Sequence, residues 1–374
     1  MIYADNAATT KMSRTAIDAI LPWLEEGFGN PSSLHTIGQQ ANEALAAARE
    51  TVAGCLGCQP NEIYFTSGGS EADNQAIRSA ARSGKARGKT HIISTAFEHH
   101  AVLHTLAQLE KEGFTVTLLD VGENGMVTPE QVAEAITDET CLVTVMYANN
   151  EIGSIQPIPE IGAVCKARKV PFHTDAVQAA AHLHINVKEQ NIDMLSLSGH
   201  KFHGPKGVGA LYCRRGLTLH PLIEGGAQER GKRAGTENIA KVTALRDRLI
   251  EGLDRIPHSV LNGDRTRRLP GNVNFCFEGI EGESMLLLLD DKGICASSGS
   301  ACTSGSLDPS HVLLAIGRPH EIAHGSLRLS LCEWNTEEEV DAILQAVPEV
   351  VQYLRNMSPV WRELQEGVLD YVIQ

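Results

Sequence analysis

The first two thirds of the chain alternate between two hydrophobic patterns. Short apolar runs rich in β-branched residues alternate with longer stretches in which apolar positions recur with helical spacing. The sequence predicts strands over residues 62–65, 91–94, 116–119, 141–146, 171–173, 194–197 and 208–213. It predicts helices over residues 40–56, 70–81, 101–111, 129–136 and 158–168. Strand–helix alternation indicates an α/β domain, in which helices cover both faces of a mostly parallel sheet.

From about Leu261 onward the pattern changes. Residues 272–277 and 326–332 have a β-type pattern, and helical stretches follow them at 284–291 and 337–355. This part of the chain is typical of a smaller α+β domain.

The two patterns predict a chain of two domains. We assign residues 16–258 to the large domain, and residues 1–15 together with 259–374 to the small one. The N-terminal segment is expected to pack with the small domain or near the active site, which in parallel sheets lies at the carboxyl ends of the strands.

Composition narrows the class of protein. The formal net charge of -14 argues against a nucleic-acid surface. The sequence contains no apolar run of about 18 residues, so we expect no membrane span. The first residues, MIYADNAATT, have neither the basic start nor the apolar core of a signal peptide. We therefore expect a cytoplasmic protein whose nine cysteines are reduced thiols.

Lys201 is the most informative candidate for catalysis. It lies in the stretch MLSLSGHKFHGPKGVG, just after the predicted strand 194–197. A lysine that is partly desolvated at such a position loses its proton readily, and a neutral amine is what a Schiff base with a carbonyl compound requires. The alternative is a structural lysine whose ammonium reaches solvent.

Residues after other strands point to pyridoxal phosphate. Asp175 and Gln178 follow the strand 171–173, and a carboxylate there can pair with a pyridinium nitrogen. In FTSGGSEADN, the amides of Gly69 and Ser70 would begin a helix, and a helix N-terminus favours a phosphate.

His99 follows a fourth strand, where it can stack on a ring or transfer protons. Together with Lys201, Asp175 and the phosphate turn, it makes a set of groups suited to pyridoxal phosphate. The competing interpretation is a chance set of polar residues that only satisfy one another.

Cys302 lies in an unusual environment for a cysteine. The run SSGSACTSGSLDPSH over residues 297–311 contains little that could pack. Gly and Ser lower the cost of several conformations, so we expect a mobile arm that carries the thiol between a buried pocket and the surface.

These motifs, in this order, resemble one family. DNAATT, FGNPSSLH, FTSGGSEADN, NNEIG, HTDAVQ, SGHKFHGPKG, RAGTEN, SSGSACTSGS and SLRLSL occur as in cysteine desulfurases of the NifS/IscS type, over nearly the whole chain. The resemblance implies fold type I of the pyridoxal-phosphate-dependent transferases, with a mostly parallel seven-stranded sheet in the large domain. It also implies a homodimer that converts L-cysteine to L-alanine and leaves the sulfur as a persulfide.

The resemblance also assigns the residues of the cofactor site. Lys201 would be the Schiff-base lysine, and Asp175 would face the pyridine nitrogen. Gln178 and Asn150 would lie near the ring oxygen. The residues that would contact the phosphate are Gly69, Ser70, Ser198, His200 and, toward the cofactor of the partner subunit, Thr236.

The remaining assignments concern the substrate. His99 would stack over the ring and manage protons, Arg328 would bind the substrate carboxylate near Asn150, and Cys302 would take the sulfur. The implied acceptor of that sulfur is a protein such as an iron–sulfur scaffold, or the machinery of tRNA thiolation. No metal site, membrane contact or direct nucleic-acid contact is expected.

Two positions depart from the family pattern. Ser70 stands where the IscS branch tends to have threonine, and both hydroxyls can contact a phosphate. The stretch RAGTENIAKVTALRDRL, which begins at Arg233, is short, because relatives carry a longer helical segment after this motif. Either the chain has a deletion here or the sequence omits residues.

Two other functions stay open. A selenocysteine lyase, or another fold type I transaminase or lyase, would use the same cofactor without needing Cys302. A non-catalytic scaffold that binds a metal or cluster through the nine cysteines would need no cofactor at all.

Overall fold

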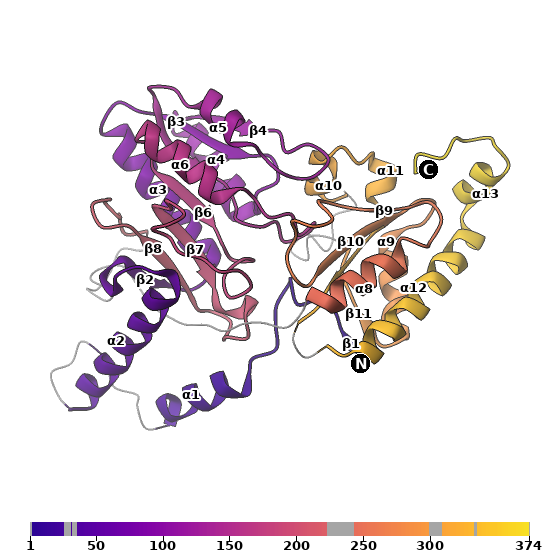
Figure 1. Cartoon of the computed structure of the whole chain (residues 1–374), viewed down its shortest axis with the longest axis horizontal. Helices are drawn as coiled ribbons and strands as arrows, with labels where there is room; N and C mark the ends of the chain where they lie inside the picture. The colour runs from indigo at the N-terminus through magenta and orange to yellow at the C-terminus, as the bar shows by residue number, and fades with distance from the viewer. Residues whose placement is uncertain are drawn as a thin grey trace.

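A computed structural model of the chain describes residues 2–25, 31, 36–222, 243–298, 309–332 and 335–373. Two bodies are visible in Figure 1: a large sheet with helices on the left, and a smaller sheet on the right, where both termini lie. None of the helices in the described ranges combines the length and apolarity that crossing a bilayer requires.

The large sheet has seven strands in the order β2-β8-β7-β6-β5-β3-β4. All of its pairs are parallel except those that β8 makes with β2 and with β7. The strands are β2 (Ile63–Thr66), β3 (His91–Thr95), β4 (Thr115–Leu119), β5 (Thr140–Thr144), β6 (Phe172–Asp175), β7 (Met194–Ser198) and β8 (Gly209–Cys213). The predicted mostly parallel, seven-stranded sheet is thus confirmed.

Helices cover both faces of this sheet because its strands are apolar on both sides. On β3, Ile93 belongs to one hydrophobic core and its neighbour Ile92 to the other. Strands buried on both faces are nearly continuous apolar runs, which is the pattern in the sequence. The helices are α2 (Thr36–Leu56), α5 (Pro129–Ala135) and α6 (Ile158–Arg168) around the first core, and α3 (Gly69–Lys85) and α4 (His100–Lys111) around the second.

The second body is built on a three-stranded antiparallel sheet of order β12-β10-β9. A third core, which includes Phe275 and Leu329, fills the space between this sheet and its helices. The strands are β9 (Ser259–Leu261), β10 (Asn272–Phe277) and β12 (Ser326–Ser330). The helices are α8 (Thr243–Leu253), α9 (Gly282–Asp291), α10 (His311–Ala315), α11 (His320–Ala323), α12 (Glu337–Met357) and α13 (Pro359–Gln365).

The N-terminal segment joins the two bodies. Strand β1 (Ile2–Tyr3) pairs in parallel with β11 (Ile294–Cys295), and Asp5 forms a bridge with Ser330 of β12. Further along, the amide of Thr10 donates to the His200 carbonyl at 2.8 Å, beside the large sheet. The segment therefore runs from the small sheet to the carboxyl ends of β6 and β7.

Helix α1 (Arg14–Glu25) was not among the predicted elements. Pro22 lies inside it, and proline disfavours a helix interior. None of its residues is buried against the rest of the described chain.

Gly209 lets the glycine turn before α3 lie directly on the sheet. A Cβ added there would lie 2.6 Å from the Leu197 carbonyl oxygen and 2.7 Å from the Gly68 Cα. We expect Gly209→Ala to lower the free energy of unfolding by about 1–3 kcal/mol, measured by urea denaturation. Gly54→Ala is the control, because an added Cβ on α2 meets nothing within 4 Å and should stabilise by about 0.5–1 kcal/mol. Equal effects of the two changes would contradict the close approach.

Candidate active site

Lys201 lies at the carboxyl end of β7, as the sequence predicted. It ends the short 3-10 turn Gly199–Lys201 that follows the strand. Its Nζ donates to the carbonyl of Ala7 at 2.6 Å and to that of Ala8 at 3.0 Å. The amine is therefore held at the edge of the sheet by the N-terminal segment.

Asp175 and Gln178 lie at the neighbouring strand end. Asp175 is the last residue of β6 and is 4% exposed, and one of its oxygens accepts from the Val177 amide at 2.9 Å. Burial raises the pKa of Asp175 to about 6, while the charge of Lys201 opposes this shift. Gln178 donates to the same Ala7 carbonyl as Lys201, at 2.9 Å.

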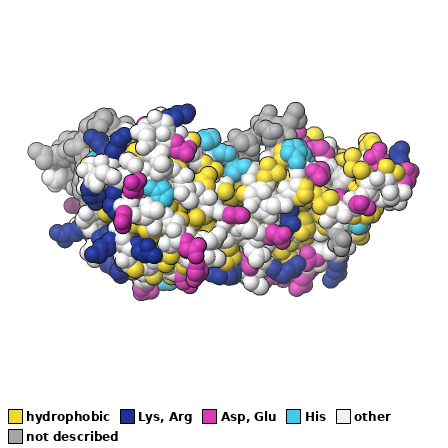
Figure 2. Space-filling model, turned by 90° about the horizontal axis from the view of Figure 1, so that it is seen from above, with side chains coloured by type: hydrophobic (Ala, Val, Ile, Leu, Met, Phe, Trp, Pro, Cys, Tyr) yellow, Lys and Arg dark blue, Asp and Glu magenta, His cyan; other side chains and the backbone are white. Residues whose placement is uncertain are grey.

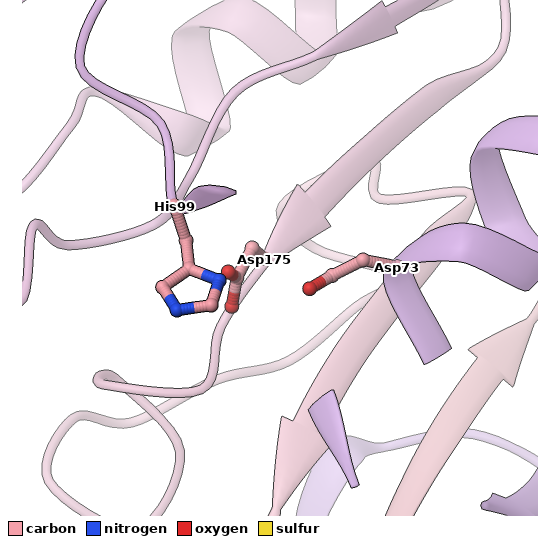
Figure 3. Close-up of side chains that lie close together, drawn as sticks. All are labelled: Asp73, His99 and Asp175. Carbon is pink, nitrogen blue, oxygen red and sulfur yellow. The ribbon is translucent and has the colours of Figure 1, made fainter. Parts of the chain in front are cut away.

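A second buried carboxylate lies beside Asp175. Ligating atoms of Asp73, His99 and Asp175 all lie within 4.8 Å of one another (Figure 3). Burial and the charge of Asp175 raise the pKa of Asp73 well above its ordinary value. Both effects favour the protonated form of Asp73, which reduces the repulsion between the two carboxyl groups.

His99 is the N-cap of α4. Its Nδ1 accepts from the Ala101 amide at 3.1 Å, so in this conformation a proton would reside on Nε2. Burial, followed by the positive charge of Lys201, lowers the pKa of His99 to about 4. The imidazole is thus neutral at physiological pH.

The predicted phosphate residues lie around the start of α3 and the end of β7. Gly69 is the first residue of α3, and Ser70 in its first turn is exposed. A Cβ added to Gly68 would lie 3.6 Å from the Ser198 Oγ, so the glycine turn and the strand end are neighbours. His200 contacts the Thr9 hydroxyl at 3.1 Å through Nδ1. Burial, aided by the charges of Lys201 and Lys206, lowers the His200 pKa to about 4.

Arg328 comes from β12 of the small sheet and is 1% exposed. One of its Nη atoms pairs with Asp5 at 2.9 Å, and the other lies 3.5 Å from the Asn150 carbonyl oxygen. Its Nε has no hydrogen-bond partner among the described residues. A buried donor without a partner is costly, so this guanidinium is suited to an additional anionic ligand.

Cys302 and Thr236 lie outside the described residues, as does the start of the short stretch after Thr236, so these predictions remain untested. The chain on either side of the cysteine segment is described. Ser297 exchanges backbone hydrogen bonds with Arg328, and the Ser310 hydroxyl donates to Glu151. His311 Nε2 lies 3.3 Å from the Glu98 carbonyl oxygen. Both ends of the segment are therefore attached to elements that carry site residues.

Sequence reasoning missed three acidic residues of the site: Asp5, Asp73 and Glu98. Asp73 and Glu98 stand inside the motifs FTSGGSEADN and AFEHHAV, but only the register of α3 and the turn before α4 direct them inward. Asp5 belongs to DNAATT, and its partner Arg328 is 323 residues away. No local pattern could indicate that pairing.

The residues present fit pyridoxal phosphate. A buried carboxylate, Asp175, can face a pyridinium, and Lys201 offers an amine at the adjacent strand end. The exposed N-terminus of α3 beside Ser198 offers amide donors to a phosphate. Asp73 lies beside Asp175, and its raised pKa favours the form that does not repel the Asp175 carboxylate.

The sequence of the chain matches a protein family and several known proteins over most of its length. Residues 2–249 and 232–343 match the family described as aminotransferase class-V. A protein named cysteine desulfurase IscS from Methanosarcina thermophila is 55% identical over 379 residues, covering 96% of this chain and 94% of the relative. A cysteine desulfurase from Nostoc sp. is 49% identical over 399 residues, covering 99% of each.

Two solved structures have the same fold. A NifS-like protein superposes with a TM-score of 0.87 at 36% identity, covering 94% of this chain and 100% of its own. A structure described as SspA in complex with cysteine has a TM-score of 0.81 at 38% identity, covering 90% of this chain and 100% of its own.

Glu98 allows a test of the buried charges. It is fully buried, and burial raises its pKa from 4.5 to about 8. The folded chain therefore binds more protons than the unfolded chain between these values, so this group makes stability fall as pH rises. Glu98→Gln cannot ionise, and we expect it to remove a slope of up to about 1.4 kcal/mol per pH unit, measured by urea denaturation from pH 5 to 8.

The matched control is Glu110→Gln, at an exposed position on α4. It should leave the slope of the wild-type profile unchanged. Parallel profiles for wild type and Glu98→Gln would show that Glu98 is not protonated in the folded protein.

Proposed function

The chain belongs to the class-V aminotransferase family, among its cysteine desulfurases, and on this basis we propose that it is a pyridoxal-phosphate-dependent enzyme that transfers sulfur from L-cysteine to Cys302. The observation that carries the proposal is the meeting of Lys201 and buried Asp175 at adjacent strand ends, in a chain whose relatives over nearly its full length have this name. The products would be L-alanine and a Cys302 persulfide.

When bound, pyridoxal phosphate supplies an electron sink for charge that develops on the substrate Cα. Asp175 would keep the pyridine nitrogen protonated, and Lys201 would hold the aldehyde and then accept the Cα proton on Nζ. The Ala7 and Ala8 carbonyls hold Nζ in place. Gly69, Ser70, Ser198 and His200 would contact the phosphate, with Thr236 reaching the phosphate bound in the partner subunit, and Gln178 and Asn150 would lie near the ring oxygen.

Arg328 would bind the substrate carboxylate. Asp5 already occupies one of its Nη groups, while Nε has no partner among the described residues. A carboxylate can therefore use Nε without breaking the ion pair. This contact orients the substrate, and the planar guanidinium does so better than a lysine would.

His99 would stack over the ring and accept the proton of the substrate thiol. Its pKa of about 4 keeps it neutral and therefore able to accept. The Cys302 thiolate would then attack the substrate sulfur, so that the S–S bond forms as the Cβ–S bond breaks. The electron pair of the Cβ–S bond would pass to Cβ, which would take the proton held by His99 as the carbon skeleton becomes alanine. The persulfide would pass its sulfur to a protein such as an iron–sulfur scaffold, or toward tRNA thiolation.

A homodimer is supported by helix α1. Ile17, Leu21, Trp23 and Leu24 on this helix are between 38% and 73% exposed, and none of its residues is buried. In Figure 1, α1 and α2 lie at the edge of the large body, away from the small sheet. An exposed apolar face of this kind is typical of an interface, and a second copy of the chain would cover it.

The proposed function predicts the behaviour of two catalytic variants. We expect wild type loaded with pyridoxal phosphate to release sulfide and equal amounts of alanine from L-cysteine in the presence of a thiol. Lys201→Ala should lose the visible absorbance of the covalently held cofactor and all measurable activity. Cys302→Ala should keep that absorbance but lose sulfide release, because the nucleophile is gone.

A surface cysteine provides the control, since Cys55→Ala changes an exposed thiol on α2 and should leave both readouts unchanged. Undiminished sulfide release by Cys302→Ala would reject Cys302 as the acceptor. Release of selenium from selenocysteine by that variant would instead favour a selenocysteine lyase. A protein that takes up no pyridoxal phosphate would reject the enzyme altogether.

The proposed dimer predicts the effect of a change on α1. Leu24→Glu should weaken self-association about 10- to 100-fold, because it removes the burial of one leucine side chain. Analytical ultracentrifugation over a range of concentrations measures this change. Leu287→Glu is the control, since Leu287 on α9 has the same 73% exposure as Leu24. A dimer that Leu24→Glu leaves intact would show that α1 is not in the interface.

A further inference from the structure

A second cavity lies at the opposite edge of the large sheet from Lys201. It has a volume of about 740 Å³. Its lining includes Thr140 at the start of β5, Pro171 just before β6 and Asp193 just before β7. These are the amino ends of the strands whose carboxyl ends carry the active site, so the two sites are distinct.

The lining of this cavity is strongly basic in a chain of net charge -14. Six cations contribute to it, namely Arg87, Lys89, Lys166, Lys169, Lys188 and Arg214. Figure 2 shows Lys and Arg side chains gathered over the end of the molecule that the large domain forms. A basic concavity attracts anions, because field lines concentrate in it.

The two carboxylates of the cavity neutralise one of these cations, Arg214, and leave the others without a carboxylate partner among the described residues. Glu62 accepts from the backbone amides of Gln59 and Arg215 at 3.0 and 2.8 Å. Asp193 pairs with Arg214 and also accepts from the Phe172 amide at 3.0 Å.

Four of the six cations have no side-chain partner within the described ranges. Lys166 donates to the Asn191 side chain at 2.7 Å. Within the described ranges, Arg87, Lys89, Lys169 and Lys188 make no side-chain ion pair or hydrogen bond. Like charges that share one cavity repel, so an anionic ligand would stabilise this arrangement.

Lys169 lines the cavity in a backbone conformation that is unfavourable for a residue with a side chain. It caps the C-terminus of α6 with φ +56°, in the left-handed region. Glycine is favoured at such a position, and a side chain there costs roughly 1 kcal/mol. Lys169 thus places its side chain at the cavity in a conformation that glycine would adopt at lower cost.

The floor of the cavity is apolar. Val170, Pro171, Val187, Ile192 and Leu217 line it. Cavities of roughly 300–1000 Å³ with an apolar lining and a few polar groups are typical of small-molecule sites. A suitable ligand would combine phosphates, for the lysines, with a flat apolar group, for the floor.

We propose that this cavity binds a phosphorylated small molecule of the nucleoside diphosphate class. The phosphates would contact Lys89, Lys169 and Lys188, and the base would lie on the apolar floor. The site is independent of the reaction at Lys201, so its test needs no assay of activity.

The test is calorimetric titration of the holoenzyme with ADP. The holoenzyme is used because its pyridoxal phosphate occupies the phosphate site near Lys201, so ADP cannot bind there. We expect saturable 1:1 binding that weakens as salt is raised. Lys89→Gln with Lys188→Gln should weaken ADP binding by about tenfold or more. Lys292→Gln, on the small domain and paired with Glu349, is the control and should change nothing.

Lys169→Gly separates binding from backbone strain. It should raise the melting temperature, because glycine relieves the left-handed conformation, and it should also weaken ADP binding. A purely structural Lys169 would give the first effect without the second and would count against the proposal.

Three further outcomes would overturn it. The first is no binding of ADP to wild type, and the second is ADP affinity that the double variant leaves unchanged. The third is inorganic pyrophosphate or an RNA oligonucleotide binding through the same lysines at least as tightly as ADP, which would reject a nucleotide-shaped site.

Discussion

The hydrogen bonds that hold the N-terminal segment between the two bodies are the constraint on which the site depends. Ala4 pairs with Ser330 of the small sheet, and Asp5 neutralises Arg328. The next carbonyls, of Ala7 and Ala8, accept from Lys201. Four positions within residues 4–8 thus fix Arg328, on the substrate side, and Lys201, on the cofactor side, relative to each other.

This arrangement explains how charged groups can be buried where the large and the small sheet meet. An uncompensated buried guanidinium or ammonium is costly, and each here has an oxygen partner from the same segment. Breaking the segment away would remove Asp5 from Arg328 and the Ala7 and Ala8 carbonyls from Lys201 at once. The segment therefore couples the position of the small sheet to the geometry of the large one.

Burial also sets the protonation of the groups around the candidate cofactor. Burial favours the neutral forms of His99, His200, Asp73 and Glu98. Desolvation is the largest cause of the pKa shift in each of these four groups, so the same physical effect acts on all of them. For Asp175 the Val177 amide and Lys201 oppose the shift that burial causes, because both favour its charged form.

The same sheet offers two edges with different chemistry. Its carboxyl edge carries the groups of the proposed reaction, and its amino edge carries lysines, most of them without a side-chain partner in the described ranges, around an apolar floor. A parallel sheet aligns all strand starts on one side and all strand ends on the other, so a set of short polar loops gathers at each edge.

The sequence by itself determined the alternation of strands and helices, the strand-end positions of Lys201, Asp175 and His99, and the glycine turn before α3. These are local: apolar period, strand length and turn residues specify them within a few neighbours along the chain. Only the tertiary structure decided the pairing of Asp5 with Arg328, the inward direction of Asp73, and the protonation of Glu98. Each of these depends on groups that are far apart in sequence or on burial, and neither leaves a pattern along the chain.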